Sequence, residues 1–543
     1  MDLTIREIAE ACGGKLTLRG GTAEADASVA SVVINSRLVE PRGVFIATVG
    51  ERVDGHRFIP AAFAQGAILA VTQKEPEQVE AEHGCMASEW GAWVLVEDTL
   101  QALKDIAEAY RRKLSVKIVG ITGSVGKTST KEFIAGVLAE KYHVLKTEGN
   151  FNNEVGVPLT LLRIRGEHEA AVVEMGISDF GEMHRLSKMV RPNVCVITNI
   201  GQSHLNNLID RDGILRAKSE IFDYMAEDGE VCLNGEDDKL AALKEIKGHK
   251  PHFFGLGRNP AEEVSMADIV GKGLWGSDAV LRVGPRDDGM KPECAQCSGQ
   301  MPGRVASAED GRQTGGTTLP VRIPLPGEHM VLNAAAAACV AWLLGLSPEE
   351  IAAGIAGVTA VSGRTNILRL PRYTIIDDCY NANPASMKAA VNLLAMADTE
   401  KVAILGDMLN LGEGSHRYHG EIGRQAGLLG IGHILCVGSE SEHMFREAQA
   451  HVGGAIAEGS DTTDAAQENA VRAGVKEGKT FPAVQAHGKA QVRWYPDTNA
   501  LLEALAADCG RLVPEGSTVL IKASHDMGFA GVLEHLKERA QYL

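Results

Sequence analysis

Short apolar runs alternate with amphipathic, helix-like stretches along most of the chain, and they fall into three blocks. The first block, residues 1–109, carries β-rich runs such as GVFIATV (43–49) and closes with an amphipathic segment over 99–112. The second block, residues 110–363, opens with a strand over 116–121 and then alternates β-rich runs with helical patterns. The third block, residues 364–543, repeats this style, with buried strands predicted at YTIID, KVAILG, HILCVG and STVLIKA.

This alternation is typical of βαβ units, which build parallel sheets with helices on their faces. We therefore predict an α/β protein of three domains. The central domain holds a mostly parallel sheet flanked by helices, the N-terminal domain is a smaller α/β unit, and the C-terminal domain is a Rossmann-like α/β unit. A polar stretch over 284–318 interrupts the central block and is predicted to be a flexible insertion.

The sharpest local pattern is the segment 116–132, where an apolar strand runs into a glycine-bearing loop and then into a helix. Gly123 and Gly126 let backbone N–H groups converge on phosphate oxygens, and the helix N-terminus adds its positive dipole end. Lys127 is placed to reach the β- and γ-phosphates, and Thr128 to ligate Mg²⁺. Ile121 occupies the first glycine position of the GxxxxGK[ST] pattern, so this loop is a variant. The alternative is an ordinary glycine turn before a helix.

Two further strands end in polar residues that suit such a loop. Glu174 follows the run 170–173, and His204 follows the run 194–197. Ligands of parallel sheets sit outside the carboxyl ends of the strands, so both side chains are expected at the same edge as Lys127. A carboxylate is a hard oxygen ligand, which makes Glu174 a candidate Mg²⁺ ligand. A surface carboxylate and a structural histidine remain the alternatives.

The net charge of −17 comes from 54 Lys and Arg against 71 Asp and Glu. It argues against a general binder of nucleic acid or anionic membranes, because such proteins need a basic face. The start of the chain shows no secretory signal, and the longest apolar run, 334–346, has 13 residues, whereas a membrane span takes about 20. We expect a soluble, cytoplasmic monomer without stable membrane insertion or nucleic-acid partners.

The ten cysteines agree with a reducing compartment, since most are scattered singly in apolar stretches. Cys294 and Cys297 form a CxxC inside the polar insertion. A closed zinc site needs four ligands, so one such pair is weak support for a metal. An incidental pair is the main interpretation, and a metal-regulated protein is the alternative.

Several motifs in order along the chain then resemble one family. They are TGSVGKT (122–128), GNFNNEVGVPLT (149–160), EMG (174–176), TNIGQSHL (198–205), AKSEI (217–221), DDCYNANPASM (377–387) and LGDMLNLGE (405–413). Together they resemble the Mur ligases, the ATP-dependent amide ligases of bacterial peptidoglycan synthesis. GNFNN, DDCYNANPASM and LGDMLNLGE are similar to the member that adds D-alanyl-D-alanine to UDP-N-acetylmuramoyl-tripeptide. The DNPR-type signature of the diaminopimelate- or lysine-adding member is absent.

The resemblance implies a reaction and two cofactors, ATP and Mg²⁺. The terminal carboxylate of the tripeptide attacks the γ-phosphate of ATP, and the amine of D-alanyl-D-alanine then attacks the acyl phosphate. This chemistry is chiefly a matter of positioning and charge neutralisation. The implied catalytic residues are Lys127, Glu174, His204 and Lys218, and the implied metal ligands are Thr128, Glu174, His204 and Lys218. Lys218 matches a position that is often carbamylated in the family.

The resemblance also implies binding residues. For ATP they are Thr122, Gly123, Ser124, Val125, Gly126, Lys127, Thr128, Ser129, Asn234, Asn333, Arg364, Asp378 and Asn381. For the muramoyl substrate they are Ser36, Arg37, Asn152 and Asn153, with NSR (35–37) and DGHRF (54–58) resembling the UDP-binding N-terminal domain. An asparagine is equally common as a turn or cap residue, so that interpretation stays open for each amide.

Three positions depart from the family pattern, namely Asn35 in place of Asp, Met330 in place of Asn, and His525 in place of Arg. Two other functions remain open. One is a related amide ligase, acting on another muramoyl precursor or adding glutamate to folate. The other is a nucleotide switch or non-catalytic ATP-binding module, although the AsnLysxAsp motif of GTPases is absent.

Overall fold

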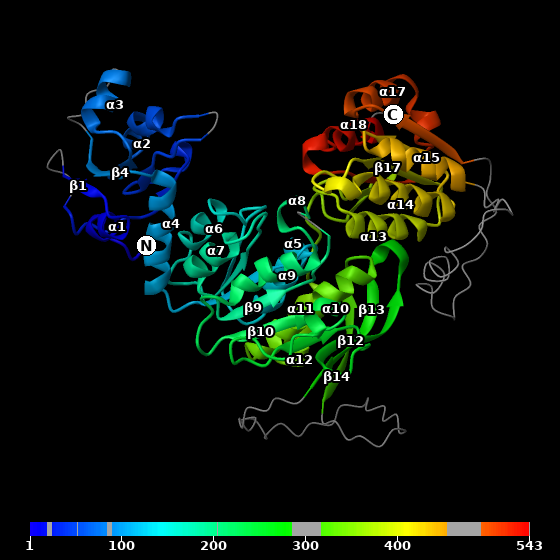
Figure 1. Cartoon of the computed structure of the whole chain (residues 1–543), viewed down its shortest axis with the longest axis horizontal. Helices are drawn as coiled ribbons and strands as arrows, with labels where there is room; N and C mark the ends of the chain where they lie inside the picture. Colours follow the sequence, from blue (N-terminus) through cyan, green and yellow to red (C-terminus); the bar gives the residue numbers. More distant parts are fainter. Residues whose placement is uncertain are drawn as a thin grey trace.

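The computed structural model describes residues 1–18, 24–50, 53–83, 90–202, 205–284, 316–452 and 490–541. Within these ranges the strands form three sheets of five, nine and six strands, which follow one another along the chain. Figure 1 shows each sheet with its helices as a separate unit, the middle unit lying between the other two. The predicted three-domain α/β fold is confirmed. The domain boundaries stay predictions, and the first, at residues 109 and 110, falls inside a helix.

The N-terminal sheet has the order β1-β5-β4-β3-β2, and β1 is its antiparallel strand. Helix α4 (Thr99–Lys113) leaves this unit, capped by the Asp98 carboxylate, which accepts hydrogen bonds from the N–H groups of Leu100 and Gln101. Its apolar stripe packs against α1 in the first unit and against α6 and α7 in the second, so it joins the two. The strands are β1 (Lys15–Thr17), β2 (Val32–Val33), β3 (Val44–Ile46), β4 (Leu69–Thr72) and β5 (Ala92–Leu95), and the helices α1 (Ile5–Ala11), α2 (Ile59–Ala64) and α3 (Pro76–His83).

The middle sheet has the order β14-β13-β12-β11-β10-β9-β6-β8-β7. The strands β6 to β12 pair in parallel, while β13 is antiparallel to both of its neighbours. The polar insertion leaves and returns at this hairpin, where Val283 lies opposite Thr317, and residues 285–315, with Cys294 and Cys297, lie outside the described residues. The strands are β6 (Lys117–Thr122), β7 (Val144–Lys146), β8 (Ala170–Glu174), β9 (Val194–Ile197), β10 (Glu230–Asn234), β11 (His252–Gly255), β12 (Glu262–Gly271), β13 (Ser277–Val283) and β14 (Thr317–Ile323).

Helices cover both faces of this sheet. One face packs with α5 (Lys127–Leu138), α11 (Glu328–Leu343) and α12 (Pro348–Ala356), and the other with α6 (Gly156–Leu161), α7 (Glu182–Val190) and α9 (Arg211–Ser219). The longest apolar run of the sequence forms the buried core of α11. Among the described residues, no helix is long and apolar enough to cross a membrane.

The third sheet has the order β15-β16-β20-β17-β18-β19, parallel except for β15. Four of its strands confirm the runs predicted from the sequence: β16 (Thr374–Asp377), β17 (Lys401–Gly406), β18 (His433–Val437) and β20 (Thr518–Lys522). The others are β15 (Asn366–Arg369) and β19 (Gln491–Tyr495). One face packs with α13 (Pro384–Ala395), α14 (Ser415–Leu428) and α15 (Ser441–His451), and the other with α17 (Thr498–Leu512) and α18 (Ala530–Gln541).

Candidate active site

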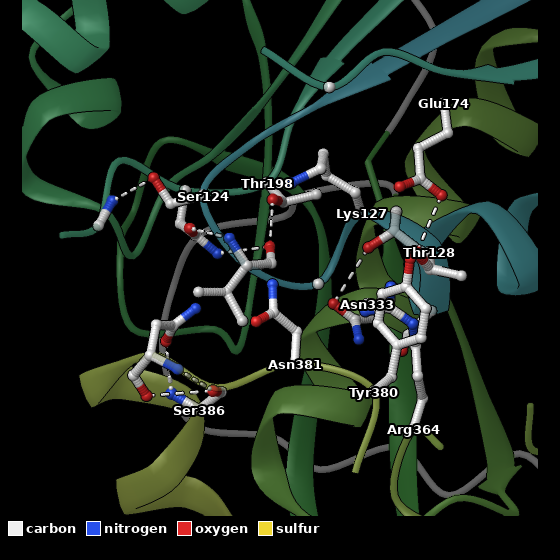
Figure 2. A pocket seen from close by; sticks show the side chains of 18 of the residues that line it. Ser124, Lys127, Thr128, Glu174, Thr198, Asn333, Arg364, Tyr380, Asn381 and Ser386 are labelled. Atoms are coloured by element: carbon white, nitrogen blue, oxygen red, sulfur yellow. Dashed lines mark hydrogen bonds between the residues drawn. The ribbon is translucent and has the colours of Figure 1, made fainter. Parts of the chain in front are cut away.

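A cavity of about 880 Å³ lies where the carboxyl ends of the middle strands face the third unit. Its lining includes the loop after β6, the end of β8, the start of α11 and the segment after β16. Figure 2 shows Lys127, Thr128 and Glu174 on the middle unit, with Arg364, Tyr380 and Asn381 from the third unit facing them. The rule that ligands bind outside the carboxyl ends of parallel strands holds here.

The phosphate loop owes its shape to two glycines with positive φ. Gly123 has φ +148° and Gly126, which precedes the first residue of α5, has φ +83°. Residues with a Cβ rarely adopt such angles, so glycine allows the strand to turn sharply into the helix. Lys127 opens α5, lines the cavity and donates a hydrogen bond to the Gly123 carbonyl at 2.9 Å. Removal from water lowers the pKa of Lys127, with Glu174 opposing the shift and Arg364 adding to it.

Substitution of Gly123 by alanine should damage this loop. A Cβ on residue 123 would overlap the hydroxyl of Thr198, and the positive φ adds backbone strain. We expect Gly123→Ala to cost about 3 kcal/mol of unfolding free energy and to weaken nucleotide binding. Gly430→Ala is the control, because Gly430 has φ +66° but no atom within 4 Å of the added Cβ, so strain alone should cost about 1 kcal/mol. Denaturant unfolding checks both, and equal losses would contradict the overlap argument.

Glu174 ends β8 as a buried carboxylate, 1% exposed, with donors on both of its oxygens. Thr128 donates its hydroxyl to Oε2 at 2.9 Å, and Asn152 donates its amide to Oε1 at 2.8 Å. The ammonium of Lys131 lies 4.0 Å from Oε2 and balances the buried charge. Lys131 itself donates to the carbonyl of Thr147 at 2.7 Å. Lys127, Thr128 and Glu174 therefore line the same cavity at the carboxyl ends of the strands, as predicted.

This donor set fits Mg²⁺, which prefers hard oxygen ligands such as a hydroxyl and a carboxylate. His204, the third predicted ligand, lies outside the described residues. Lys218, on α9, is 2% exposed and is not among the residues that line the cavity. Burial lowers the pKa of Lys218 well below the usual lysine value, and the nearby ammonium of Lys127 lowers it further. No group of three or more His, Cys, Asp or Glu arranged to hold a metal is found within the described ranges.

The third unit contributes cations to the cavity. The guanidinium of Arg364 lies 4.1 Å from the centre of the Tyr380 ring, a cation–π contact that fixes its direction. Asp378 accepts a hydrogen bond from the Thr365 N–H at 2.9 Å and pairs with the Lys522 ammonium at 2.7 Å. Arg364 is also close enough to Lys127 to lower its pKa. Two positive charges from different units therefore face one another, which suits a polyanionic ligand between them.

The remaining predicted residues divide into two sets. Asn333, 7% exposed on α11, lines the cavity and accepts a hydrogen bond from the Thr130 hydroxyl at 3.1 Å. Asn153 lines it too, but its side-chain oxygen caps the start of α6 by accepting from the N–H groups of Val155 and Gly156. The other predicted residues of the lining are Ser124, Val125, Gly126, Ser129, Asn152, Arg364, Asp378 and Asn381.

Six predicted residues within the described ranges do not line the cavity: Lys218, described above, and Thr122, Gly123, Asn234, Ser36 and Arg37. Thr122 is buried under the loop. Asn234 ends β10 and is 3% exposed, with its amide bonded to the Thr198 carbonyl. Ser36 and Arg37 lie in a short 3₁₀ helix of the N-terminal unit, which Asn35 caps.

Sequence reasoning missed many residues of the lining, among them Thr198, Asn199, His329, Tyr380 and Lys522. Thr198 and Asn199 lie in the segment after β9, from which only His204 was predicted. The rule that ligands bind at the carboxyl ends of parallel strands would also have identified these two residues. Tyr380 and Lys522 follow β16 and end β20, which are neighbours only in the folded sheet. Sequence spacing could not reveal that pairing.

Family comparisons cover most of the chain. The family described as "Mur ligase family, catalytic domain" matches residues 28–111, "Mur ligase middle domain" matches 121–341, and "Mur ligase, glutamate ligase domain" matches 363–525. These three matches run in chain order and correspond to the three sheets.

Curated relatives and solved structures agree with these matches. The UDP-N-acetylmuramoyl-tripeptide–D-alanyl-D-alanine ligase of Bacillus subtilis is 30% identical over 540 residues, with 98% of each chain covered. The enzyme of that name from Treponema pallidum is 35% identical over 70% of this chain and 74% of its own. A crystal structure of MurF from Acinetobacter baumannii is 28% identical, covers 98% of both chains and has a TM-score of 0.74. MurF ligase from Thermotoga maritima in complex with ADP is 25% identical, covers 94% of this chain and 98% of its own, and has a TM-score of 0.69.

Proposed function

This chain belongs to the Mur ligase family, and we propose that it joins D-alanyl-D-alanine to UDP-N-acetylmuramoyl-tripeptide with cleavage of ATP to ADP and phosphate, in peptidoglycan synthesis. The full-length relatives that carry this name support the substrate pair. The observation that carries the chemistry is the cavity that gathers Lys127, Thr128, Glu174 and Arg364 between two units.

The reaction has two steps, and both need negative charge to be neutralised. The tripeptide carboxylate attacks the γ-phosphorus of ATP, which breaks the bond to the β-phosphate oxygen and gives an acyl phosphate and ADP. The amine of D-alanyl-D-alanine then attacks the acyl carbon, loses its proton, and expels phosphate. We propose that Lys127 and Arg364 neutralise the charge of the anionic tripeptide and the triphosphate and so allow the two to approach each other, because both cations line the same cavity.

Thr128 and Glu174 would hold Mg²⁺, which supplies further charge neutralisation when bound. Asn152 and Lys131 keep the Glu174 carboxylate in place through a hydrogen bond and a charge contact. We propose Lys218 as a carbamylated ligand of a second Mg²⁺ together with His204. Its buried side chain and lowered pKa support this, because carbamylation needs the neutral amine.

The other partners and the location of the protein are part of the same proposal. UDP-N-acetylmuramoyl-tripeptide would bind with its nucleotide at Ser36 and Arg37 in the N-terminal unit, and its peptide end near Asn152 and Asn153. We propose that the protein works in the cytoplasm, since its nucleotide-linked substrate and ATP are both cytoplasmic compounds, and that it is a monomer.

A product assay tests the proposal. Purified protein is incubated with ATP, Mg²⁺, D-alanyl-D-alanine and either the diaminopimelate- or the lysine-containing UDP-muramoyl tripeptide. We expect a pentapeptide product and one phosphate per product, with phosphate release that needs both the acid and the amine. Phosphate release without the amine would indicate a nucleotide switch. Product from glutamate or another amine, and none from D-alanyl-D-alanine, would indicate a different amide ligase.

A further inference from the structure

The segment 198–201 is hydrogen-bonded to the backbone of the phosphate loop. The carboxamide of Asn199 engages both polar groups of the Val125 backbone: the Val125 N–H donates to Oδ1 at 3.0 Å, and Nδ2 donates to the Val125 carbonyl at 3.0 Å. The hydroxyl of Thr198 donates to the same carbonyl at 2.6 Å. Two more bonds join the segment to Ser124, whose N–H donates to the Asn199 carbonyl and whose Oγ accepts from the Gly201 N–H.

These bonds determine the orientation of the Val125 peptide group in the phosphate loop. A peptide carbonyl oxygen that faced a phosphate would repel it, whereas N–H groups and the Lys127 ammonium attract it. The Val125 carbonyl is held by two donors, so it is turned toward residues 198 and 199. Figure 2 shows Thr198 and Ser124 beside the loop at this point. The segment therefore fixes the loop shape before a nucleotide arrives, which lowers the ordering cost of binding.

The same segment is held from its other side by the end of β10. The amide of Asn234 donates to the Thr198 carbonyl at 2.9 Å, and its oxygen accepts from the Glu236 N–H at 2.9 Å. The Asp237 carboxylate accepts from the Ile200 N–H at 2.8 Å. Asn234 is 3% exposed and lies outside the cavity lining, so it has no surface to offer a nucleotide.

We propose that segment 198–201 is a clamp on the phosphate loop, and that Asn234 serves nucleotide binding through this clamp instead of by touching the nucleotide. Asn199, Thr198 and Asn234 are thus positioning residues. The inference deepens the proposed function, since it rests on nucleotide binding at the phosphate loop. This positioning role differs from a purely structural one, because loss of the clamp should change only the nucleotide affinity and the Michaelis constant for ATP.

A double-mutant cycle tests the clamp with ADP as the probe. The dissociation constant of Mg²⁺-ADP is measured by calorimetry for Asn199→Ala, Asn234→Ala and the double variant. We expect about tenfold weaker binding for Asn199→Ala and about fivefold for Asn234→Ala, because each leaves hydrogen-bonding groups of the loop or of segment 198–201 unpaired. The double variant should match Asn199→Ala within about twofold, since both act on one connected network. Effects that multiply to about fiftyfold would overturn the proposal and indicate a direct contact by Asn234.

Controls separate the clamp from folding and from the ligase assignment. Asn259 makes the same kind of bonds near β10, donating to the Gly235 carbonyl and accepting from the Ala261 N–H, but outside the cavity. Asn259→Ala should leave ADP affinity unchanged, and a comparable loss there would overturn the clamp.

If Asn199→Ala does not fold, Thr198→Val removes one of the two bonds to the Val125 carbonyl with a side chain of equal shape. We expect it to weaken ADP binding at least threefold with an unchanged Michaelis constant for the muramoyl tripeptide, and unchanged ADP binding would overturn the clamp. Because ADP binding needs no ligation, failure of the product assay leaves this test intact.

Discussion

Lys127→Ala is expected to lower kcat/KM for ATP by about a thousandfold while the protein stays folded. The ammonium lies in the cavity at the first residue of α5, facing Arg364 of the third unit. In a site that excludes water, a fixed positive charge stabilises developing phosphate charge far more than it would in solvent. Its hydrogen bond to the Gly123 carbonyl is a small part of the loop structure, so unfolding should change little.

Steady-state ligation and thermal unfolding check this prediction together. Lys141→Ala is the matched control, because Lys141 is exposed and its ammonium also donates to a glycine carbonyl, that of Gly345, at 2.8 Å. It should keep full activity. If Lys127→Ala retained ligation near the level of this control, the phosphate loop would not be the ATP site.

The strand-end rule explains which parts of the site could be predicted from sequence. Lys127, Thr128 and Glu174 follow strands that the apolar runs mark clearly, and neighbouring parallel strands must bring their carboxyl ends to one edge. The four buried strands of the third unit were found for the same reason: each is a short, strongly apolar run. Here local composition and the sheet architecture agree.

The roles of the asparagine side chains could not be predicted in this way. The family resemblance implied that Asn234 and Asn333 bind the nucleotide and that Asn153 binds the muramoyl substrate. In the fold, Asn153 caps a helix at the cavity edge, Asn234 bonds the Thr198 carbonyl beneath it, and Asn333 lines it. An asparagine can donate and accept anywhere, so the choice depends on which backbone groups are left unpaired nearby.

The edge of the middle sheet was also beyond prediction. The β12–β13–β14 extension is antiparallel, and its last two strands are separated by the polar insertion. The pairing of Val283 with Thr317 depends on a closure across a long segment, which no local pattern encodes. Likewise, Arg364 meets Tyr380 through the third-unit fold, and neither the pairing nor its direction follows from sequence distance.

Glu174→Gln is expected to lower kcat by about a hundredfold to a thousandfold and to raise the Mg²⁺ concentration needed for half-maximal rate. Glutamine keeps the shape of the side chain but removes the negative charge, and its single oxygen can accept from only one of the two groups, Thr128 and Asn152, that donate to the two Glu174 oxygens. A neutral amide is a much poorer Mg²⁺ ligand than a carboxylate. The Lys131 ammonium, 4.0 Å away, would also lose part of its charge balance and repel a cation in the cavity.

The control is the second carboxylate that pairs with Lys131, because its removal changes the same ion pair without touching the cavity. Glu132 pairs with Lys131 at 3.2 Å but does not line the cavity. Glu132→Gln therefore tests loss of charge beside Lys131 without loss of a metal ligand, and it should leave the Mg²⁺ dependence unchanged. Calorimetry of ADP binding with and without Mg²⁺ gives a second measurement: Glu174→Gln should abolish most of the gain that Mg²⁺ provides. Equal Mg²⁺ dependence in the two variants would mean that Glu174 acts by shaping the loop and not by holding the metal.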